Sequence, residues 1–265
     1  MKIQVREGVV LEHDGGGNLR DILIEHDKKL LREFIAARGS DASRIDFHTE
    51  LGADTEVELM AWDDPEAAWI YRHSMSHVLA QAVRHLFPKA QLAIGPAIDG
   101  GFYCDFEVEE PFTPEDLKAI EKEMKRVVKQ NHRFEREEIS RDEARSRLEG
   151  DTYKLEILDD LKEDQTLTFY TDGDFVDLCR GPHMLSTGQV KHYKLLSVAG
   201  AYWRGDAKGP QLQRIYGTVW PTRDQLDAYL FRLKEAKKLL TKRVEKGKMK
   251  PDQMADVLNS ITPTL

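Results

Sequence analysis

The sequence predicts an α+β fold in which helices pack on a mostly antiparallel sheet. Long segments with apolar residues at helical spacing alternate with short segments rich in β-branched and aromatic residues, a pattern typical of mixed helices and strands. The chain has 265 residues, of which 40% are hydrophobic and 32% are charged. This composition is typical of a folded protein, and the length allows one or two domains with their own cores.

The N-terminal residues are expected to form a small α+β domain. The pattern predicts a β-hairpin at Lys2–Val5 and Val9–Glu12, a helix at Leu19–Ala37 and a short strand at Val57–Met60. A proline and three acidic residues then interrupt this pattern of elements at Asp63-Asp64-Pro65-Glu66. We therefore predict three parts of the chain, at 1–62, 63–221 and 222–265.

A long helix is predicted from about Pro65 to Phe87. One face carries an apolar stripe made of Met75, Val78, Leu79, Ala82, Val83 and Leu86. At about 100° per residue, His73, His77 and Arg84 fall on the opposite face, away from the expected core. The two histidines share that face, as paired metal ligands or a paired acid and base must.

Further elements follow from capping and strand signals. Gly101–Phe106 is a predicted strand, and Thr113 with Pro114 begins a helix. Thr222-Arg223-Asp224-Gln225 is a capping box that opens the last long helix. Between these helices the pattern predicts four strands, at Thr166–Tyr170, Phe175–Leu178, His192–Val198 and Leu212–Trp220.

The composition also narrows the location and the partners of the chain. It has no run of about 18 apolar residues, so no contact with a membrane interior is expected. The N-terminus lacks the apolar segment of a signal peptide. With Cys104 and Cys179 as its only cysteines, the chain is expected in the reducing cytoplasm.

Charge is distributed unevenly along the chain, although the net charge is −8. Asp46 to Glu66 is acidic, whereas Arg232 to Lys250 is strongly basic. A charge run is most often a solvated face. For the basic segment, a contact with an RNA backbone is about as plausible, and it would involve Arg232, Lys237, Lys238 and Lys242.

Two short motifs carry the chemistry: His73-Ser74-Met75-Ser76-His77 and Cys179-Arg180-Gly181-Pro182-His183. Together they offer three imidazoles and one thiol, the ligand set of a tetrahedral zinc site or of a hydrolytic pocket like one. Asp177 would share a strand face with Cys179 and could orient an imidazole or bind an ammonium group. The alternative is that all four motif residues are buried, hydrogen-bonded and inert.

Several strings in order resemble the N-terminal half of bacterial threonyl-tRNA synthetase, from about residue 40 to about residue 238. They are Arg72–Ala80, Ile94-Gly95-Pro96, Gly101-Phe102-Tyr103, Asp177–His183, Ala199–Asp206 and Leu212–Thr218. The resemblance implies a ubiquitin-like TGS domain at 1–62, an editing domain at 63–221, and a linker helix with a divergent tail at 222–265. No role is assigned to residues 239–265.

The resemblance implies an aminoacyl-tRNA deacylase that removes serine from mischarged Ser-tRNA(Thr). Such editing is needed because one methyl group changes binding by only about 1–3 kcal/mol. His73, His77, Asp177, Cys179 and His183 would be the catalytic residues. Substrate contacts would come from Lys154, Tyr103 and Cys104, of which Cys104 replaces the tyrosine common in the family. No cofactor would be required, and zinc, if present, would bind His73, His77, Cys179 and His183.

The aminoacylation core of the synthetase is not found in these residues. We therefore expect a trans-acting editing protein or a truncated synthetase, without ATP binding and with possible association to a separate aminoacylation subunit. Its partner would be the acceptor end of tRNA(Thr). Two alternatives remain, a non-catalytic tRNA-binding or regulatory fragment and a zinc-binding structural domain. Because no assigned site residue precedes His73, loss of the TGS-like part is expected to affect tRNA positioning more than the chemical step.

Overall fold

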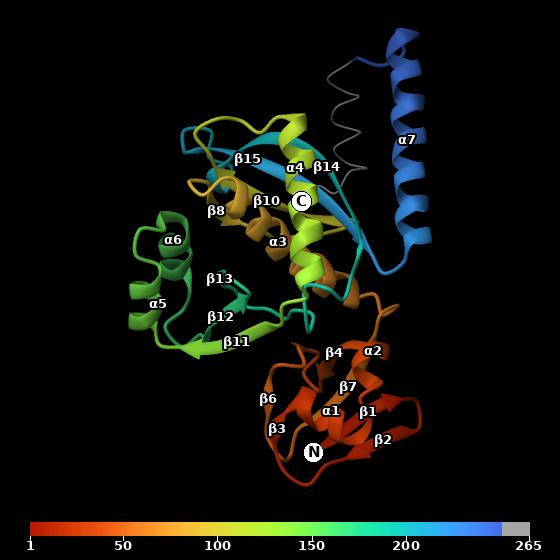
Figure 1. Ribbon diagram of the computed structural model, residues 1–265, viewed down its shortest axis with the longest axis vertical. Helices are drawn as coiled ribbons and strands as arrows, with labels where there is room; N and C mark the ends of the chain where they lie inside the picture. The colour runs from red at the N-terminus through yellow and green to blue at the C-terminus, as the bar shows by residue number, and fades with distance from the viewer. Residues whose placement is uncertain (251–265) are drawn as a thin grey trace.

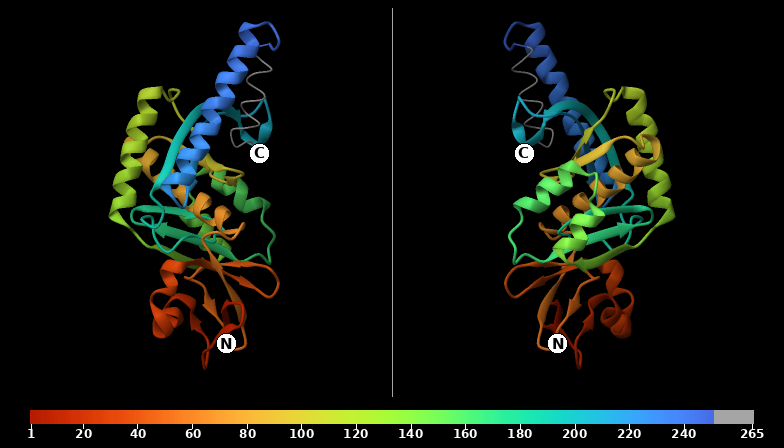
Figure 2. Two further views of the ribbon diagram at one scale, coloured as in Figure 1. Left: turned by 90° about the vertical axis from the view of Figure 1, so that its right-hand side faces the viewer. Right: turned by 90° about the vertical axis from the view of Figure 1, so that its left-hand side faces the viewer.

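The computed structural model describes residues 1–250 and shows the predicted α+β architecture, with mostly antiparallel sheets (Figure 1). The end of the predicted tail, 251–265, lies outside the described residues. The N-terminal unit lies at one end of the molecule and the last helix at the other, as the side views also show (Figure 2). Among the described helices, none is both long and apolar enough to cross a membrane.

The N-terminal unit is built on a five-stranded sheet with the order β2-β1-β7-β4-β5. The predicted hairpin is present as β1 (Lys2–Arg6) and β2 (Val9–Glu12), and the predicted strand as β7 (Glu56–Ala61), which runs parallel to β1. The helices α1 (Leu19–Asp27) and α2 (Leu30–Glu33) cover this sheet. The smaller strands are β3 (Gly17–Asn18), β4 (Phe34–Gly39), β5 (Arg44–Ile45) and β6 (Glu50–Leu51).

The predicted helix at Leu19–Ala37 is wrong in its last part. The chain leaves the helical conformation at Phe34, and Phe34–Gly39 pairs as β4 with β7. Phe34, Ile35, Ala36 and Ala37 are all buried in succession. A short apolar run of this kind fits a buried helix as well as a buried strand, so periodicity could not decide between them.

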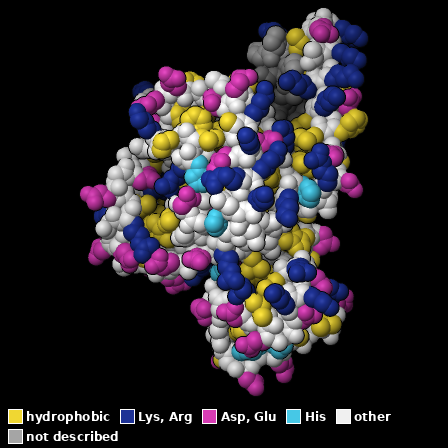
Figure 3. All heavy atoms as spheres, viewed as in Figure 1, with side chains coloured by type: hydrophobic (Ala, Val, Ile, Leu, Met, Phe, Trp, Pro, Cys, Tyr) yellow, Lys and Arg dark blue, Asp and Glu magenta, His cyan; other side chains and the backbone are white. Residues whose placement is uncertain are grey.

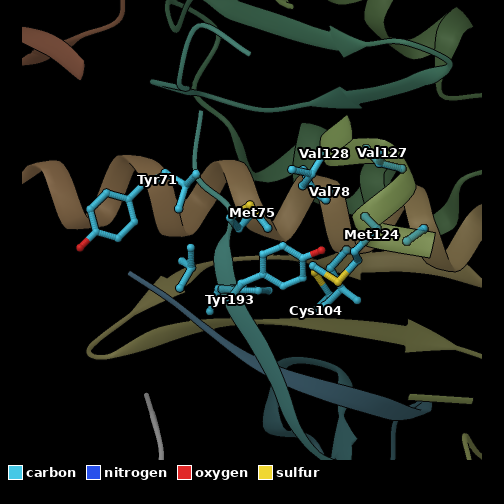
Figure 4. Close-up of a cluster of buried hydrophobic side chains, with 14 of the residues drawn as sticks. Tyr71, Met75, Val78, Cys104, Met124, Val127, Val128 and Tyr193 are labelled. Atoms are coloured by element: carbon cyan, nitrogen blue, oxygen red, sulfur yellow. The ribbon is translucent and has the colours of Figure 1, made fainter. Parts of the chain in front are cut away.

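The central part consists of a four-strand path, β14-β15-β10-β8, packed against the long helix α3 (Ala67–Leu86). Its strands are β8 (Gln91–Ile94), β10 (Gly101–Glu107), β14 (His192–Tyr202) and β15 (Gln211–Trp220), with β9 (Ala97–Ile98) paired to β10. The helix α4 (Pro114–Gln130) begins with a capping box between Thr113 and Asp116 and packs on α3. Figure 4 shows the core between these elements, where Met75, Met124 and Tyr193 meet.

The expected division of α3 into a core face and an open face is wrong. His77 is only 3% exposed, whereas Leu86, placed in the apolar stripe, is 41% exposed. A second sheet covers the histidine side of the helix, so α3 is buried on both faces along most of its length. Only the tertiary arrangement shows this, because the helical period identifies faces but not what covers them.

The second sheet has three antiparallel strands in the order β11-β12-β13. They are β11 (Phe134–Ile139), β12 (Leu167–Asp172) and β13 (Phe175–Leu178). Between β11 and β12 the chain forms α5 (Arg141–Arg147) and α6 (Thr152–Asp160), capped by the side chains of Ser140 and Asp151. Of these elements, β12 and β13 match predicted strands, whereas β11, α5 and α6 were not predicted.

The chain then passes through a 3₁₀ turn, η1 (Trp203–Gly205), and ends its described part in α7 (Arg223–Glu245). The predicted capping box between Thr222 and Gln225 is present at the start of α7. The N-terminal unit has its own apolar cluster, but Ile35, Ala36 and Met60 also join the central core. The two parts are therefore in close contact across the predicted boundary near residue 62.

Candidate active site

The structure brings the two sequence motifs together. His73 and His77 lie one turn apart on α3, and Cys179 and His183 lie in the segment that follows β13. The ligand atoms of the four residues all lie within 4.8 Å of one another. Cys179 Sγ is 3.3 Å from Nε2 of His73 and 3.3 Å from Nε2 of His183. Two segments about a hundred residues apart thus form one compact cluster.

The tautomer of His183 follows from its hydrogen bonds. Its Nδ1 lies 3.1 Å from Ser74 Oγ, which also accepts from the backbone N–H of Met184 and donates to the carbonyl oxygen of Ile70. With its one hydrogen already used, Ser74 can only accept from His183, so the proton of His183 lies on Nδ1. The lone pair of Nε2 is then directed toward Cys179, where it can accept a proton or bind a metal.

The turn between Cys179 and His183 depends on a glycine. Gly181 has a φ of +63°, which a side chain rarely tolerates. A Cβ atom there would also lie 2.1 Å from the hydroxyl of Tyr170. The ring of His183 stacks on Phe134 at 4.6 Å between centroids and meets the edge of Tyr170 at 4.6 Å. These contacts hold the imidazole from two sides.

A buried ion pair forms the second part of the site. Lys154 Nζ on α6 lies 2.6 Å from Asp177 Oδ1 on β13, and the two side chains are 7% and 11% exposed. Burial alone would lower the pKa of Lys154, but the adjacent carboxylate outweighs it and the pKa is raised. Burial also raises the pKa of Asp177, and the ammonium of Lys154 offsets part of this effect. At 2.6 Å we assign both groups as charged at neutral pH.

All three histidines of the cluster are neutral near pH 7. Burial lowers the pKa of His73 to about 4, and the charge of Lys154 acts in the same direction. Burial, followed by the effect of the neighbouring imidazoles, lowers the pKa values of His77 and His183 well below the usual range. Neutral imidazoles can accept a proton from water or donate a lone pair to a metal ion.

Cys179 is a thiol in this environment and not a thiolate. Burial, followed by the nearby charge of Asp177, raises the pKa of Cys179 to about 12. At pH 7 the thiolate would then be on the order of 10⁻⁵ of the population, too little for a nucleophile. A bound cation would reverse this, because a coordinating thiol is deprotonated by the metal.

Most of these groups line a cavity of about 560 Å³, but His183 is 0% exposed and is not on its wall. His73, His77, Lys154, Asp177 and Cys179 are on its wall, together with Trp69, Ser76, Leu92, Ile94, Gly95, Pro96, Ile157, Leu178, Arg180 and Gly181. Tyr103 and Cys104, which the resemblance placed near the substrate, lie outside this wall and are 1% and 0% exposed. Figure 4 shows Cys104 within the apolar cluster, and its thiol donates to the carbonyl oxygen of Ser76.

The four motif residues fit a zinc ion. Tetrahedral zinc with bonds of about 2.0–2.3 Å has ligand atoms roughly 3.3–3.8 Å apart, and two of the distances here are already 3.3 Å. Asp172, fully buried on β12, lies 3.8 Å from His77 Nδ1, and both groups lack a hydrogen-bond partner among the described residues. A carboxylate behind a ligating imidazole is the usual support of a metal-bound histidine.

Sequence reasoning missed Asp46, Phe134 and Tyr170 as neighbours of the site. Asp46 was counted in the acidic, solvated run, yet it is 1% exposed and accepts a hydrogen bond from Tyr170. A single acidic residue among others carries no sequence signal of burial. The expected RNA-contact residues Arg232, Lys237, Lys238 and Lys242 are all exposed on α7, and dark blue side chains follow this helix in Figure 3.

Comparison with known proteins agrees with the motifs. Residues 167–216 match the family described as the threonyl and alanyl tRNA synthetase second additional domain. Over 240 residues, the chain is 47% identical to the threonine–tRNA ligase of Clostridium botulinum (strain Kyoto / Type A2), covering 90% of this chain and 38% of that protein. The corresponding protein of Clostridium tetani (strain Massachusetts / E88) is 47% identical, with 37% of it covered.

The chain thus spans little more than a third of the length of these relatives. The matched family segment contains Cys179, His183 and the two strands that precede them, β12 and β13. The longer alignments extend the similarity to most of the chain. The resemblance to threonyl-tRNA synthetase predicted from the motifs is confirmed. Most of the chain is thus similar to a part of bacterial threonine–tRNA ligases, and residues 167–216 match the threonyl and alanyl tRNA synthetase second additional domain.

Proposed function

We propose that this chain hydrolyses the ester bond of serine wrongly attached to tRNA(Thr). The observation that carries the proposal is the shared cavity wall, on which neutral imidazoles lie beside a buried lysine–aspartate pair. Ester hydrolysis needs an acceptor for a proton of water and a positive charge for the developing oxyanion. The cavity offers both.

The proposed reaction uses these groups in turn. Neutral His73 accepts a proton from a water molecule as the water oxygen attacks the ester carbonyl. The ammonium of Lys154 stabilises the negative charge on the carbonyl oxygen, and Asp177 holds that ammonium and attracts the amino group of the serine. The bond between the carbonyl carbon and the ribose oxygen then breaks, and His73 returns the proton to the ribose oxygen. The products are free serine and uncharged tRNA.

His77 and His183 support this arrangement. His77 Nε2 lies 3.9 Å from Asp177 Oδ2, so it lies between the ion pair and the other imidazoles. If zinc is bound by His73, His77, Cys179 and His183, the ion would supply Lewis-acid polarisation of the water or the carbonyl. The roles of Lys154 and Asp177 would remain the same, because neither belongs to the ligand set.

Selectivity for serine would come from exclusion of threonine. The two amino acids differ by a methyl group on the β-carbon, and attraction alone separates them poorly. Lys154 is fixed by its ion pair, and Cys179 by the backbone N–H of Gly181 at 3.2 Å. We propose that these two side chains form the wall that the methyl group of threonine would meet.

Two basic surfaces are proposed to contact the RNA backbone. One is α7, with Arg232, Lys237, Lys238 and Lys242. It extends on the side of the molecule opposite α6, whereas the site lies between α3 and α6 (Figure 1), so it would meet RNA away from the ester. The other surface is a hollow of about 780 Å³ whose charged lining residues are Arg32, Lys125, Lys129 and Lys191.

The proposal is tested by deacylation of Ser-tRNA(Thr) and Thr-tRNA(Thr) by the purified 265-residue protein. We expect rapid loss of serine and little loss of threonine. His73→Ala should slow hydrolysis about 10²-fold or more. His26→Ala, an exposed histidine on α1, serves as the matched control and should be unchanged. Equal rates on both substrates, or full activity of His73→Ala, would contradict the proposed site.

A zinc-binding structural domain is the second candidate, because the four ligand atoms lie within 4.8 Å. Stoichiometric zinc together with no deacylation by the wild type would favour it. Binding of tRNA without hydrolysis or zinc would favour a binding or regulatory module. Association with a separate aminoacylation subunit and the lack of ATP binding stay predictions.

A further inference from the structure

We infer that the N-terminal unit completes the hydrolytic site, with Asp46 as a positioning residue for Tyr170 and, through it, for His183. This inference rests on the proposed function and extends it to a part of the chain that precedes both motifs. It differs from the expectation that loss of the N-terminal unit affects tRNA positioning more than the chemical step.

Asp46 is a charged side chain in an interior position. It follows β5 in the N-terminal unit and is 1% exposed. A carboxylate is rarely buried so completely unless its oxygens are hydrogen-bonded. Here each oxygen has partners, so the position of the carboxylate is well defined.

The two oxygens of Asp46 serve different parts of the protein. Oδ1 accepts from the backbone N–H of His48 at 3.1 Å and from the hydroxyl of Thr49 at 2.9 Å, both in its own loop. Oδ2 accepts from the hydroxyl of Tyr170 at 2.6 Å and lies 3.4 Å from the backbone nitrogen of His183. Asp46 is therefore a direct link between the N-terminal unit and the motif that contains two of the site residues.

Tyr170 connects Asp46 to His183 in the site. Its ring meets His183 edge-on at 4.6 Å, and its hydroxyl occupies the space that a side chain at Gly181 would fill. A second contact runs parallel to the first, from His48 Nε2 to the carbonyl oxygen of Met184 at 3.4 Å. The Cys179–His183 turn thus lies against a surface formed by Tyr170 and the loop after β5.

This arrangement has a consequence for the reaction. Reacting groups must be held within about 0.5 Å of their productive geometry, and a shift of about 1 Å can slow a reaction on the order of 10²-fold. Without the Asp46 carboxylate, the Tyr170 hydroxyl loses its charged hydrogen-bond partner. The Cys179–His183 turn then loses part of the surface that it packs against. The chemical step should then slow while the affinity for tRNA stays nearly constant.

The test compares Asp46→Asn and Tyr170→Phe with Asp41→Asn. Asp41 is exposed in the same unit, and among residues 1–250 it accepts hydrogen bonds only within its own turn, from Ser43. Two readouts are measured: kcat and KM for Ser-tRNA(Thr), and the rate at which a thiol reagent labels Cys179. The labelling is done in a Cys104→Ala background, so that only one thiol remains.

We expect Asp46→Asn and Tyr170→Phe each to lower kcat about 10-fold or more with little change in KM. Both should change the labelling rate of Cys179 several-fold, whereas Asp41→Asn should leave both readouts unchanged. The double variant should be no worse than the more severe single variant, because both changes break one link.

Unchanged kcat and unchanged labelling in a folded Asp46→Asn protein would overturn the inference, as would a change confined to KM. If Asp46→Asn does not fold, Tyr170→Phe decides alone, since it keeps the carboxylate and removes only the hydroxyl. The labelling rate does not depend on deacylation. A wild type without hydrolytic activity would contradict the proposed function, while the labelling of Cys179 would still support or overturn the positioning role of Asp46.

Discussion

Breaking the Lys154–Asp177 pair should destabilise the protein strongly. In Lys154→Met, Asp177, whose side chain is only 11% exposed, loses the ammonium at 2.6 Å. Removing one partner of a buried pair costs about 3–5 kcal/mol, because an uncompensated charge remains. For a protein of this size, each kcal/mol lowers the melting temperature by roughly 2–4 °C, so a decrease of roughly 6–20 °C is expected.

The control is the exposed pair between Lys89 and Glu109, whose side chains are 76% and 72% exposed. Lys89→Met should change stability by less than about 1 kcal/mol, because solvent screens such a pair. The double variant Lys154→Met with Asp177→Leu should recover part of the loss, since no charge is left buried. Melting temperatures and urea unfolding of the four proteins measure these differences.

The pH dependence gives a second check on the same residue. Burial raises the pKa of Asp177 in the folded protein, and loss of Lys154 should raise it further. An acid with a higher pKa when folded binds a proton on folding, so stability falls as pH rises through the window above its unfolded value. Lys154→Met should therefore be less destabilised at pH 5 than at pH 8. Equal losses at the two pH values, or a loss below about 1 kcal/mol at pH 8, would refute the reasoning.

Three further outcomes are expected. If the four-residue cluster binds zinc, zinc should raise the melting temperature of the wild type but not of His183→Ala. Metal analysis and thermal unfolding of the two proteins measure this difference. Equal stabilisation of both proteins would contradict the assigned ligands. Gly181→Ala should lose about 2 kcal/mol or more of stability and most activity, because its φ is +63° and a Cβ would lie 2.1 Å from the Tyr170 hydroxyl. Gly150 has a φ of +87° with open space around it, so Gly150→Ala is the control for backbone strain without a steric clash. Charge reversal at Lys237, Lys238 and Lys242 should weaken tRNA binding and flatten its salt dependence without changing the single-turnover rate; an unchanged salt slope would exclude α7 from the RNA contact.

Local patterns were sufficient for elements whose signal lies within a few residues. The hairpin of β1 and β2, the long helix α3, the start of α4 at Thr113 and the capping box of α7 all occur where periodicity and capping predicted them. The motifs also identified the relatives, because the order of several rare strings is specific to a family. Spacing placed His73 next to His77, and Cys179 near His183, since helical and turn geometry act over short distances.

Tertiary structure decided what local patterns leave open. The segment Phe34–Gly39 became a strand because β7 lies beside it. Cys104 lies on β10 with its thiol directed at α3, so its side chain belongs to the apolar core and not to the cavity wall. Packing also lowers the pKa of His73, so that its imidazole is neutral, and places Lys154 next to Asp177. Asp46, which the sequence pattern assigned to a solvated acidic run, is buried and contacts Tyr170. Burial and charge pairing depend on residues distant in sequence, and the free energy of an ionised group depends on that environment far more than on its neighbours along the chain.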